Sequence, residues 1–192
     1  YSTYVMLHSM NVKWPCLSFD ILPDSLGRDR RIFPQSMYLV TGTQAKRPKD
    51  NELLVLKMSS LAKTLAQDDD DDDDDDGDLD VDPILESKSL PCNSTTNRIR
   101  VSPFAGRTGE FLVAQMAENS DVNIWDVSPH VQSFDKPGMT IQPQQSKPQH
   151  VVKAHKSEGY AVDWSPLSQT GQLLTGDVDG NIYLSSRVSS GW

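Results

Sequence analysis

Cysteine is scarce in this sequence, which has only Cys16 and Cys92 among 192 residues. The two form no CxxC pair, so neither a zinc site nor a disulfide framework is indicated, and we expect free thiols in a reducing compartment. Long apolar runs are also missing, since none approaches the ~20 residues of a membrane-spanning helix, and no signal peptide is visible. These absences argue against disulfide-stapled and membrane proteins, and we expect no membrane partner.

Enzyme motifs are equally scarce. The four histidines show no metal-ligand spacing with the cysteines; they are His8, His130, His150 and His155. No glycine-rich phosphate loop and no nucleophile motif occurs. We therefore expect no catalysis, no cofactor and no metal. Direct nucleic-acid binding is not indicated either, because no basic stripe with interleaved aromatic residues is present.

Negative charge is concentrated in one segment. Its members are Asp68, Asp69, Asp70, Asp71, Asp72, Asp73, Asp74, Asp75, Asp76, Asp78, Asp80 and Asp82, with no Lys or Arg among them. Without these twelve, 15 acidic residues remain against 18 basic ones, so this segment accounts for the net charge of −9. A block of like charge stays solvated and attracts a basic partner over about 8 Å at physiological salt. We expect an acidic disordered loop over 67–96 whose aspartates bind a basic client.

Two other interpretations of the aspartates stay open. The run could be a solubilising loop without a dedicated partner. It could also bind calcium weakly, although its spacing lacks the glycine and the terminal glutamate of a calcium loop. Similarly, the basic residues 46–49 are compatible with either a nuclear import signal or a polar hairpin connection.

Short apolar stretches separated by turn residues favour an all-β architecture of antiparallel sheets. Strands are expected near 17–22, 38–43, 53–56, 98–101, 111–115, 122–127, 160–164, 172–175 and 182–184. Before them, apolar residues recur at helical spacing from Tyr1 to Val12, and Trp14-Pro15 would end a helix, so a short helix is expected over 1–14. Four prolines in 128–150 predict a Pro- and Gln-rich connection without regular structure.

Two segments resemble each other. Residues 98–127 and 160–186 each contain a strand ending in Ser-Pro, a second apolar strand, a tight polar turn and a third strand. The first segment ends in Trp125-Asp126, and the pattern resembles the WD repeat of β-propellers. The resemblance implies WD-repeat blades at 97–127 and 151–192.

The same resemblance implies structural roles for four residues. Trp125 and Asp126 form the WD dipeptide, His155 stands where the repeat has Gly-His, and Asp179 lies in the tight turn before the last strand. In the family, His and Asp hydrogen-bond across the blade and reach a Ser/Thr and the Trp, a network that fixes register when it is satisfied. In the second unit Ser185-Ser186 replaces Trp-Asp and Asp177 replaces the usual Ser, so an incomplete network is expected.

A propeller needs about four to eight blades of about 40–45 residues each. This chain supplies two recognisable blades and part of a third. We therefore expect a partial WD-repeat β-propeller, preceded by the short helix, in an N-terminal fragment of a longer protein. Such a fragment would expose sheet edges and tend to aggregate.

The N-terminal part carries the most specific pattern. Residues 14–20 read Trp-Pro-Cys-Leu-Ser-Phe-Asp, residues 4–9 read Tyr-Val-Met-Leu-His-Ser, and residues 41–45 read Thr-Gly-Thr-Gln-Ala. This resembles the N-terminal element of the histone-binding WD-repeat proteins, here over 15–66. In that family a helix packs beside the propeller, and the segment after Trp-Pro supplies the outer strand that closes the ring. With its acidic insertion, the chain most resembles the ribosome-assembly branch, the glutamate-rich WD-repeat proteins.

This resemblance also implies a function. The expected protein is a non-catalytic chaperone in the nucleus and nucleolus, which binds a basic ribosomal protein of the large subunit through the acidic loop and the propeller surface. The alternative is a histone-binding chaperone or chromatin-complex scaffold with core histones as partners. A generic scaffold in a ubiquitin-ligase or signalling complex also stays open, because propellers host many functions.

Overall fold

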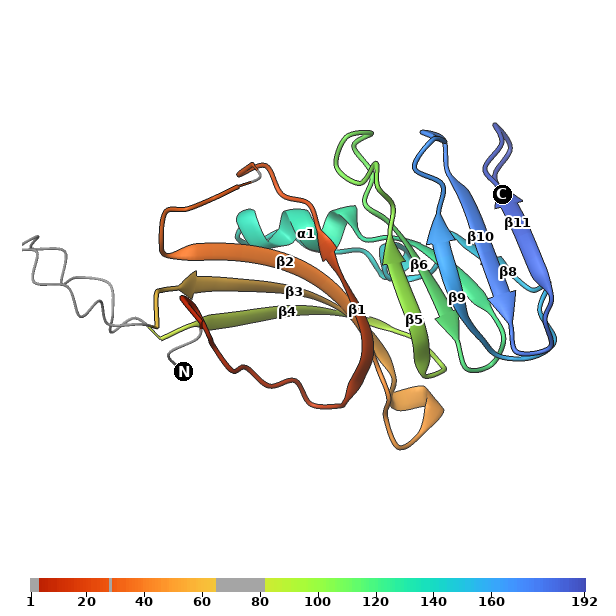
Figure 1. The fold of residues 1–192 in the computed structure, drawn as a ribbon, viewed down its shortest axis with the longest axis horizontal. Helices are drawn as coiled ribbons and strands as arrows, with labels where there is room; N and C mark the ends of the chain where they lie inside the picture. Colours follow the sequence, from red (N-terminus) through yellow and green to blue (C-terminus); the bar gives the residue numbers. More distant parts are fainter. Residues whose placement is uncertain (1–3, 28, 65–81) are drawn as a thin grey trace, which may run out of the picture.

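The computed structural model describes residues 4–27, 29–64 and 82–192 (Figure 1). Within them, antiparallel strands form three sheets, and every strand expected from the sequence is present. The all-β, partial propeller architecture is thereby confirmed. The acidic residues from Asp68 to Asp80, and the disorder expected around them, lie outside the described residues. None of the helices in the described part of the chain is long and apolar enough to cross a membrane.

The first sheet has the strand order β1-β2-β3-β4. Its members are β1 (Cys16–Leu22), β2 (Gln35–Thr43), β3 (Glu52–Leu61) and β4 (Ile84–Pro91). β2 and β3 form the expected hairpin, with Val40 opposite Val55 in the buried centre. The basic residues 46–49 lie in its connection, partly in the 3-10 turn η1 (Pro48–Asp50), where Arg47 Nε donates to Asp50 at 2.6 Å. The hairpin interpretation of this stretch fits the structure, and the import signal stays a prediction.

The second and third sheets correspond to the two repeats. The second contains β5 (Thr96–Val101), β6 (Leu112–Ala117), β7 (Val122–Asp126) and β8 (His150–Val152) in that order. The third contains β9 (Gly159–Trp164), β10 (Gln172–Asp177) and β11 (Ile182–Ser186). Because β8 pairs with β7 but directly precedes β9 in the chain, the second repeat supplies the outer strand of the first repeat's sheet. The second repeat therefore contributes strands to two consecutive sheets, and this links the sheets.

The inner strands β1, β5 and β9 lie side by side (Figure 1). Side chains of β1 accept hydrogen bonds from the backbone of β5: the Ile99 amide donates to Ser18 Oγ (3.1 Å) and the Val101 amide to Asp20 Oδ2 (2.8 Å). The Trp164 Nε1 of β9 donates to the Arg100 carbonyl (2.9 Å). The polar positions of the Leu-Ser-Phe-Asp motif therefore satisfy the amides at the edge of the neighbouring sheet.

Two apolar cores fill the spaces between the sheets. The core between the first and second sheets includes Leu22, Val40, Val55, Ile99, Val113 and Trp125. The core between the second and third includes Met116, Ile124, Val162, Trp164 and Leu173. Burying each of these larger side chains contributes about 1.5–3 kcal/mol, so the contacts between sheets are a main source of stability.

The helix expected over 1–14 is wrong for the described residues 4–14, which contain no helix. This segment runs extended along the first sheet, where the Leu7 amide donates to Thr64 Oγ1 (3.0 Å) and His8 Nε2 lies 2.8 Å from the Ala62 carbonyl oxygen. Val12 packs on the face of the sheet opposite the second sheet. A helix this short is marginal in water, and the end of β3 offers hydrogen-bond partners instead.

The segment after Trp14-Pro15 does not form an outer strand. It forms β1, which pairs with β2 and lies beside β5, whereas β4 takes the opposite edge of the first sheet. β4 falls inside the acidic loop expected over 67–96, so residues 84–91 of that range are a regular strand. These residues form a strand because they pair with the apolar strand β3, whose other edge is already paired with β2.

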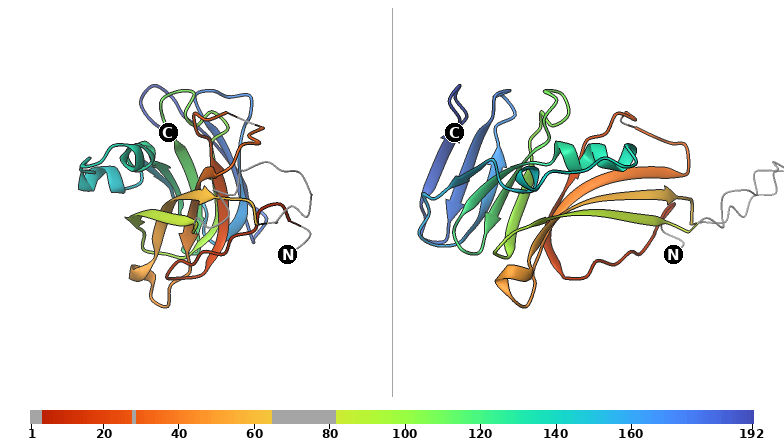
Figure 2. Two further views of the ribbon diagram at one scale, coloured as in Figure 1. Left: turned by 90° about the vertical axis from the view of Figure 1, so that its left-hand side faces the viewer. Right: turned by 180° about the vertical axis from the view of Figure 1, so that it is seen from behind.

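The connection over 128–150 has regular structure despite its prolines. It contains the helix α1 (Ser128–Asp135) and the 3-10 turn η2 (Pro143–Ser146). Proline is tolerated in the first turn of a helix, where its missing amide would have no partner, and Pro129 lies there. α1 reaches back to the first sheet (Figure 2). There Lys57 Nζ lies 2.9 Å from Asp135 Oδ1, and the Tyr38 hydroxyl donates to the same carboxylate. The connection therefore joins the second sheet to the first sheet.

Large apolar side chains remain exposed at both ends of the array of sheets. At one end they are Leu17, Phe19 and Ile21 on β1, and at the other Leu174, Ile182 and Leu184 on β10 and β11. Phe19 is 64% exposed and Ile182 is 72% exposed, far more than the residues between the sheets. Contiguous apolar surfaces of this kind mark places where further protein packs, or where chains associate.

Candidate functional site

The acidic segment connects β3 to β4 at the outer end of the first sheet. On the β3 side, the Thr64 amide donates to the Val5 carbonyl at 3.0 Å, so the extended N-terminal segment holds the chain just before the aspartates. On the β4 side, Asp82 is exposed two residues before the strand begins. Figure 1 shows this end of the sheet pointing away from the second and third sheets. The described residues on both sides of the acidic segment therefore lie at the outer end of the first sheet.

The lysines of the first sheet near α1 are already engaged. Hydrogen bonding to Asp135 raises the pKa of Lys57, and the Lys88 ammonium lies 5.4 Å from the centre of the Phe134 ring. Both side chains are directed to the face that α1 covers. The exposed acidic groups at the start of β4, Asp82 and Glu86, form no ion pair with them.

A buried polar network holds the second sheet together at Trp125. The indole Nε1 donates to Gln115 Oε1 (3.0 Å), and Asn123 Nδ2 donates to the same oxygen (3.1 Å). Gln115 Nε2 in turn donates to Thr96 Oγ1 (2.7 Å). Gln115 is completely buried, so these bonds satisfy polar groups that would otherwise cost stability. Sequence reasoning missed Gln115, although a polar residue inside the apolar run Leu-Val-Ala-Gln-Met-Ala was a usable signal.

Asp126 joins the end of β7 to the start of α1. Its Oδ1 accepts hydrogen bonds from the Ser128 amide (2.9 Å), from the Ser128 hydroxyl, and from the Phe111 amide at 3.4 Å. The second half of the WD dipeptide thus positions the first residues of the connection that reaches the first sheet.

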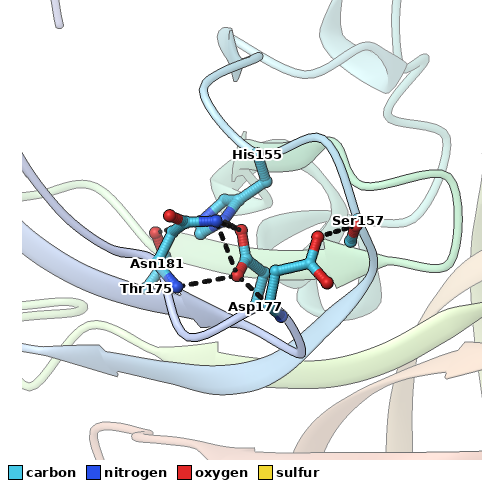
Figure 3. Close-up of polar contacts among 6 residues, drawn as sticks. His155, Ser157, Thr175, Asp177 and Asn181 are labelled. Atoms are coloured by element: carbon cyan, nitrogen blue, oxygen red, sulfur yellow. Dashed lines mark hydrogen bonds and ion pairs between the residues drawn. The ribbon is translucent and has the colours of Figure 1, made fainter.

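A second network surrounds His155 in the third sheet (Figure 3). His155 Nε2 lies 2.8 Å from Thr175 Oγ1, and Nδ1 lies 2.9 Å from Asp177 Oδ2. The Asn181 amide also donates to Asp177 (2.9 Å), and the side chains of His155 and Asp177 are both inaccessible to solvent. Both ring nitrogens have partners, so the network is complete at the histidine even though Ser185 stands where the first repeat has Trp125.

The partner of His155 is Asp177, and the resemblance had pointed to Asp179. Asp179 is exposed and accepts a hydrogen bond from the Ser157 hydroxyl. A carboxylate at position 177 lies at the end of β10, directly within reach of the imidazole, whereas Asp179 lies two residues further into the turn. The aspartate at the usual serine position therefore takes over the hydrogen bond to the histidine.

Replacing Asp177 by asparagine is expected to remove part of the acid sensitivity of the fold. Hydrogen bonds, chiefly from His155, lower the pKa of Asp177 from 3.8 to about 2. The carboxylate therefore stabilises the folded state above the unfolded pKa, and this contribution is lost as the pH falls towards about 2. The free energy of unfolding, measured by urea titration at falling pH, should drop less steeply below about pH 4 in the variant. Asp179→Asn is the matched control, and an identical curve for Asp177→Asn and the native chain would contradict this assignment.

The two cysteines differ in their surroundings. Both are free thiols, as expected, with Cys16 exposed and Cys92 buried. Burial raises the pKa of the Cys92 thiol to about 11, so it stays protonated and unreactive at neutral pH. Among the described residues, no group of three or more His, Cys, Asp or Glu side chains is placed to hold a metal ion.

The sequence matches a protein family and several known proteins. Residues 1–62 match the family described as the histone-binding protein RBBP4 or a subunit of the CAF1 complex. Glutamate-rich WD repeat-containing protein 1 of Dictyostelium discoideum is 39% identical over 203 residues, covering 100% of this chain and 41% of the relative. The chain is homologous to the glutamate-rich WD-repeat proteins. The resemblance inferred from the Trp-Pro-Cys-Leu-Ser-Phe-Asp element is confirmed.

Two further relatives extend over this whole WD-repeat chain. Ribosome assembly protein rrb1 of Schizosaccharomyces pombe is 46% identical over 192 residues, covering 100% of this chain and 39% of the relative. Protein HEAT STRESS TOLERANT DWD 1 of Arabidopsis thaliana is 34% identical over 215 residues, covering 100% and 45% respectively. The chain thus spans 39% to 45% of the length of these relatives.

Proposed function

We propose that the protein is an assembly chaperone for the large ribosomal subunit, which binds a basic ribosomal protein. The observation that carries the proposal is the segment 68–82, with twelve aspartates in fifteen residues, between β3 and β4 of a WD-repeat sheet. The relative of Schizosaccharomyces pombe, 46% identical to this chain, is named as a ribosome assembly protein. A basic ribosomal protein is the kind of client that such a concentrated negative charge attracts.

The mechanism is electrostatic protection followed by transfer. The aspartates cover Lys and Arg side chains that would otherwise bind RNA indiscriminately, while the propeller surface holds a second part of the client. Contacts between opposite charges in water are individually weak and weaken further with salt. Ribosomal RNA is a denser polyanion, so it can displace the aspartates when the client reaches its site of assembly. This function places the protein in the nucleus and nucleolus.

The second candidate is a histone-binding chaperone or chromatin scaffold. It is supported by the match of residues 1–62 to the family described as histone-binding. Core histones are also basic, so the aspartates suit them equally well. The two candidates differ in the client, and the mechanism of charge neutralisation is common to both.

Affinity purification of the full-length protein, with quantitative identification of what binds to it, tests the assignment. We expect one large-subunit ribosomal protein in near-equal amount and little histone. A bait whose twelve aspartates are replaced by asparagine is the matched control and should lose that partner. Recovery of core histones without any ribosomal protein would overturn the first proposal in favour of the second.

A further inference from the structure

The outer edge of the first sheet is formed by β4, the strand that follows the acidic segment in the chain. β4 pairs with β3 along its whole length. The turn η2 also lies close to β4, but no other strand among the described residues pairs with its second side. At eight residues, β4 is long for an edge strand. A free edge presents backbone amide and carbonyl groups that readily accept another strand, and proteins usually shorten or cover such edges.

The register shows which backbone groups face outward. Glu52 lies opposite Pro91, and the Cys92 amide donates to the Asn51 carbonyl at 3.0 Å. In an antiparallel ladder, hydrogen-bonded and non-hydrogen-bonded residues alternate, so residues 84, 86, 88 and 90 bond to β3. The residues between them present their amide and carbonyl groups to the outside: Leu85, Ser87 and Ser89.

The surroundings of this edge attract positive charge. Asp82 precedes β4 and Glu86 lies within it, directly opposite Lys57 of β3, and both acidic residues are exposed. The cations of the same sheet are occupied on the face that α1 covers, Lys57 by Asp135 and Lys88 by the Phe134 ring. The sequence leading into β4, residues 68–82, contains twelve Asp and no Lys or Arg. Any added strand would gain the backbone hydrogen bonds, but only a basic one would also gain electrostatic attraction from the acidic residues.

We propose that the free edge of β4 binds an extended, Lys/Arg-rich segment of a partner as a fifth strand of the first sheet. Leu85, Ser87 and Ser89 supply the backbone hydrogen bonds of this strand addition, and the neighbouring carboxylates select for basic side chains. The inference rests on the proposed function only in that the client is basic, and it adds the mode by which the client is held. It predicts that the client contributes an unfolded segment and not a folded surface.

The alternative is an edge that is merely protected against pairing. Glu86 and Lys88 are charged, and charged side chains on an edge strand discourage association. In that case β4 takes up no strand, and basic partners are held by charge alone.

Binding of a defined peptide to the full chain separates the two cases. The probe is a fluorescently labelled ten-residue peptide of alternating Lys and Val, titrated by anisotropy, and its control is an alternating Lys-Pro peptide of equal charge. Proline removes every second amide and holds the chain away from β geometry. We expect the Lys-Pro peptide to bind the native protein about ten-fold more weakly, as the loss of backbone hydrogen bonds implies. Equal affinity of the two peptides would overturn the proposal.

Variants of the edge give an independent measurement. Ser87→Pro removes an outward amide without touching the ladder to β3, and proline is tolerated on edge strands. We expect it to weaken binding of the Lys-Val peptide about ten-fold and to leave binding of the Lys-Pro peptide unchanged, while Ser87→Ala changes neither. Glu86→Pro removes an amide that bonds to β3 and should lower the melting temperature. It is the control for disruption of the β3–β4 ladder.

The failure of this inference is distinguishable from failure of the proposed function. If replacing the twelve aspartates by asparagine abolishes peptide binding and Ser87→Pro has no effect, charge recruitment stands and strand addition is wrong. If neither change affects binding of the Lys-Val peptide, both the electrostatic client and the strand are wrong. If Ser87→Pro does not fold, the comparison of the two peptides on the native protein still decides.

Discussion

Replacing Trp125 by alanine is expected to lower the free energy of unfolding by about 3–5 kcal/mol. Trp125 is 1% exposed and packs in the core between the first and second sheets, against residues of both. Truncation leaves a large cavity that the surrounding strands cannot close, and it removes one of the two donors to Gln115 Oε1. Urea unfolding of the full chain, followed by circular dichroism, measures the loss.

Two control variants separate packing from hydrogen bonding at this position. Trp125→Phe keeps most of the bulk and removes the Nε1 donor, so it should cost about 1–2 kcal/mol. Leu167→Ala, at a position that is 91% exposed, should change the free energy of unfolding by less than about 0.5 kcal/mol. A Trp125→Ala loss no larger than that of Leu167→Ala would show that the sheets do not pack as described.

Replacing all twelve aspartates of 68–82 by asparagine is expected to weaken binding of the basic client about 100-fold at low ionic strength. The change removes the charge that makes the chain acidic overall and keeps side-chain size, so it tests attraction and not shape. Because salt screens such attraction, the native affinity should fall steeply with rising salt, and the asparagine variant should show little salt dependence. Calorimetric titration with the purified client over a range of salt concentrations measures both quantities.

The matched control keeps the charge and changes the side chain. Replacing the same residues by glutamate should preserve affinity and salt dependence, because a carboxylate on a side chain one methylene longer serves the same electrostatic role. If the asparagine variant binds with native affinity and native salt dependence, the run is a solubilising segment without a dedicated partner. Loss of binding in the glutamate variant would indicate instead a site that depends on side-chain geometry.

The strands and the repeats could be predicted from sequence because they depend on local patterns. Apolar residues alternate or cluster at each strand, and turn residues separate them. The WD dipeptide placed Trp125 and Asp126 at the end of the third strand of a repeat, as the structure has it in β7. The boundaries extended by a few residues, for example in β3 (Glu52–Leu61), because pairing with β2 and β4 continues beyond the apolar centre.

The predictions that were wrong concern three segments: the expected N-terminal helix, the expected acidic loop and the expected irregular connection. Residues 4–14 have helical spacing of apolar residues, but the hydrogen-bond groups at the end of β3 hold them extended. Residues 84–91 read as part of an acidic loop, but they complete the first sheet next to β3. Pro129 was taken to exclude regular structure, but at the first turn of α1 it is compatible with a helix. In the first two cases a contact distant in sequence outweighed the local preference, whereas Pro129 is accommodated by its position in the helix.

In the candidate site, too, some features could be predicted from the sequence and others only from the structure. The charge of the aspartates, and hence the basic character of a partner, follows from sequence, since charge does not depend on conformation. The position of this charge in the fold does not follow from sequence. Only the structure shows that the segment joins β3 to β4, the strand at the outer edge of the first sheet. Similarly, the sequence identified His155, but only the geometry selected Asp177 over Asp179 as its partner.

By itself, the sequence determined the fold class, the two repeats, the family resemblance and the negative charge, because strand periodicity, motif spacing and composition are local properties. The tertiary structure alone decided that β1 lies beside β5, that Gln115 accepts a hydrogen bond from Trp125, and that β4, which follows the acidic segment, is the edge strand of its sheet. These features depend on pairings between residues far apart in the chain. Hydrogen-bond geometry and packing select among such pairings only after the sheets have assembled.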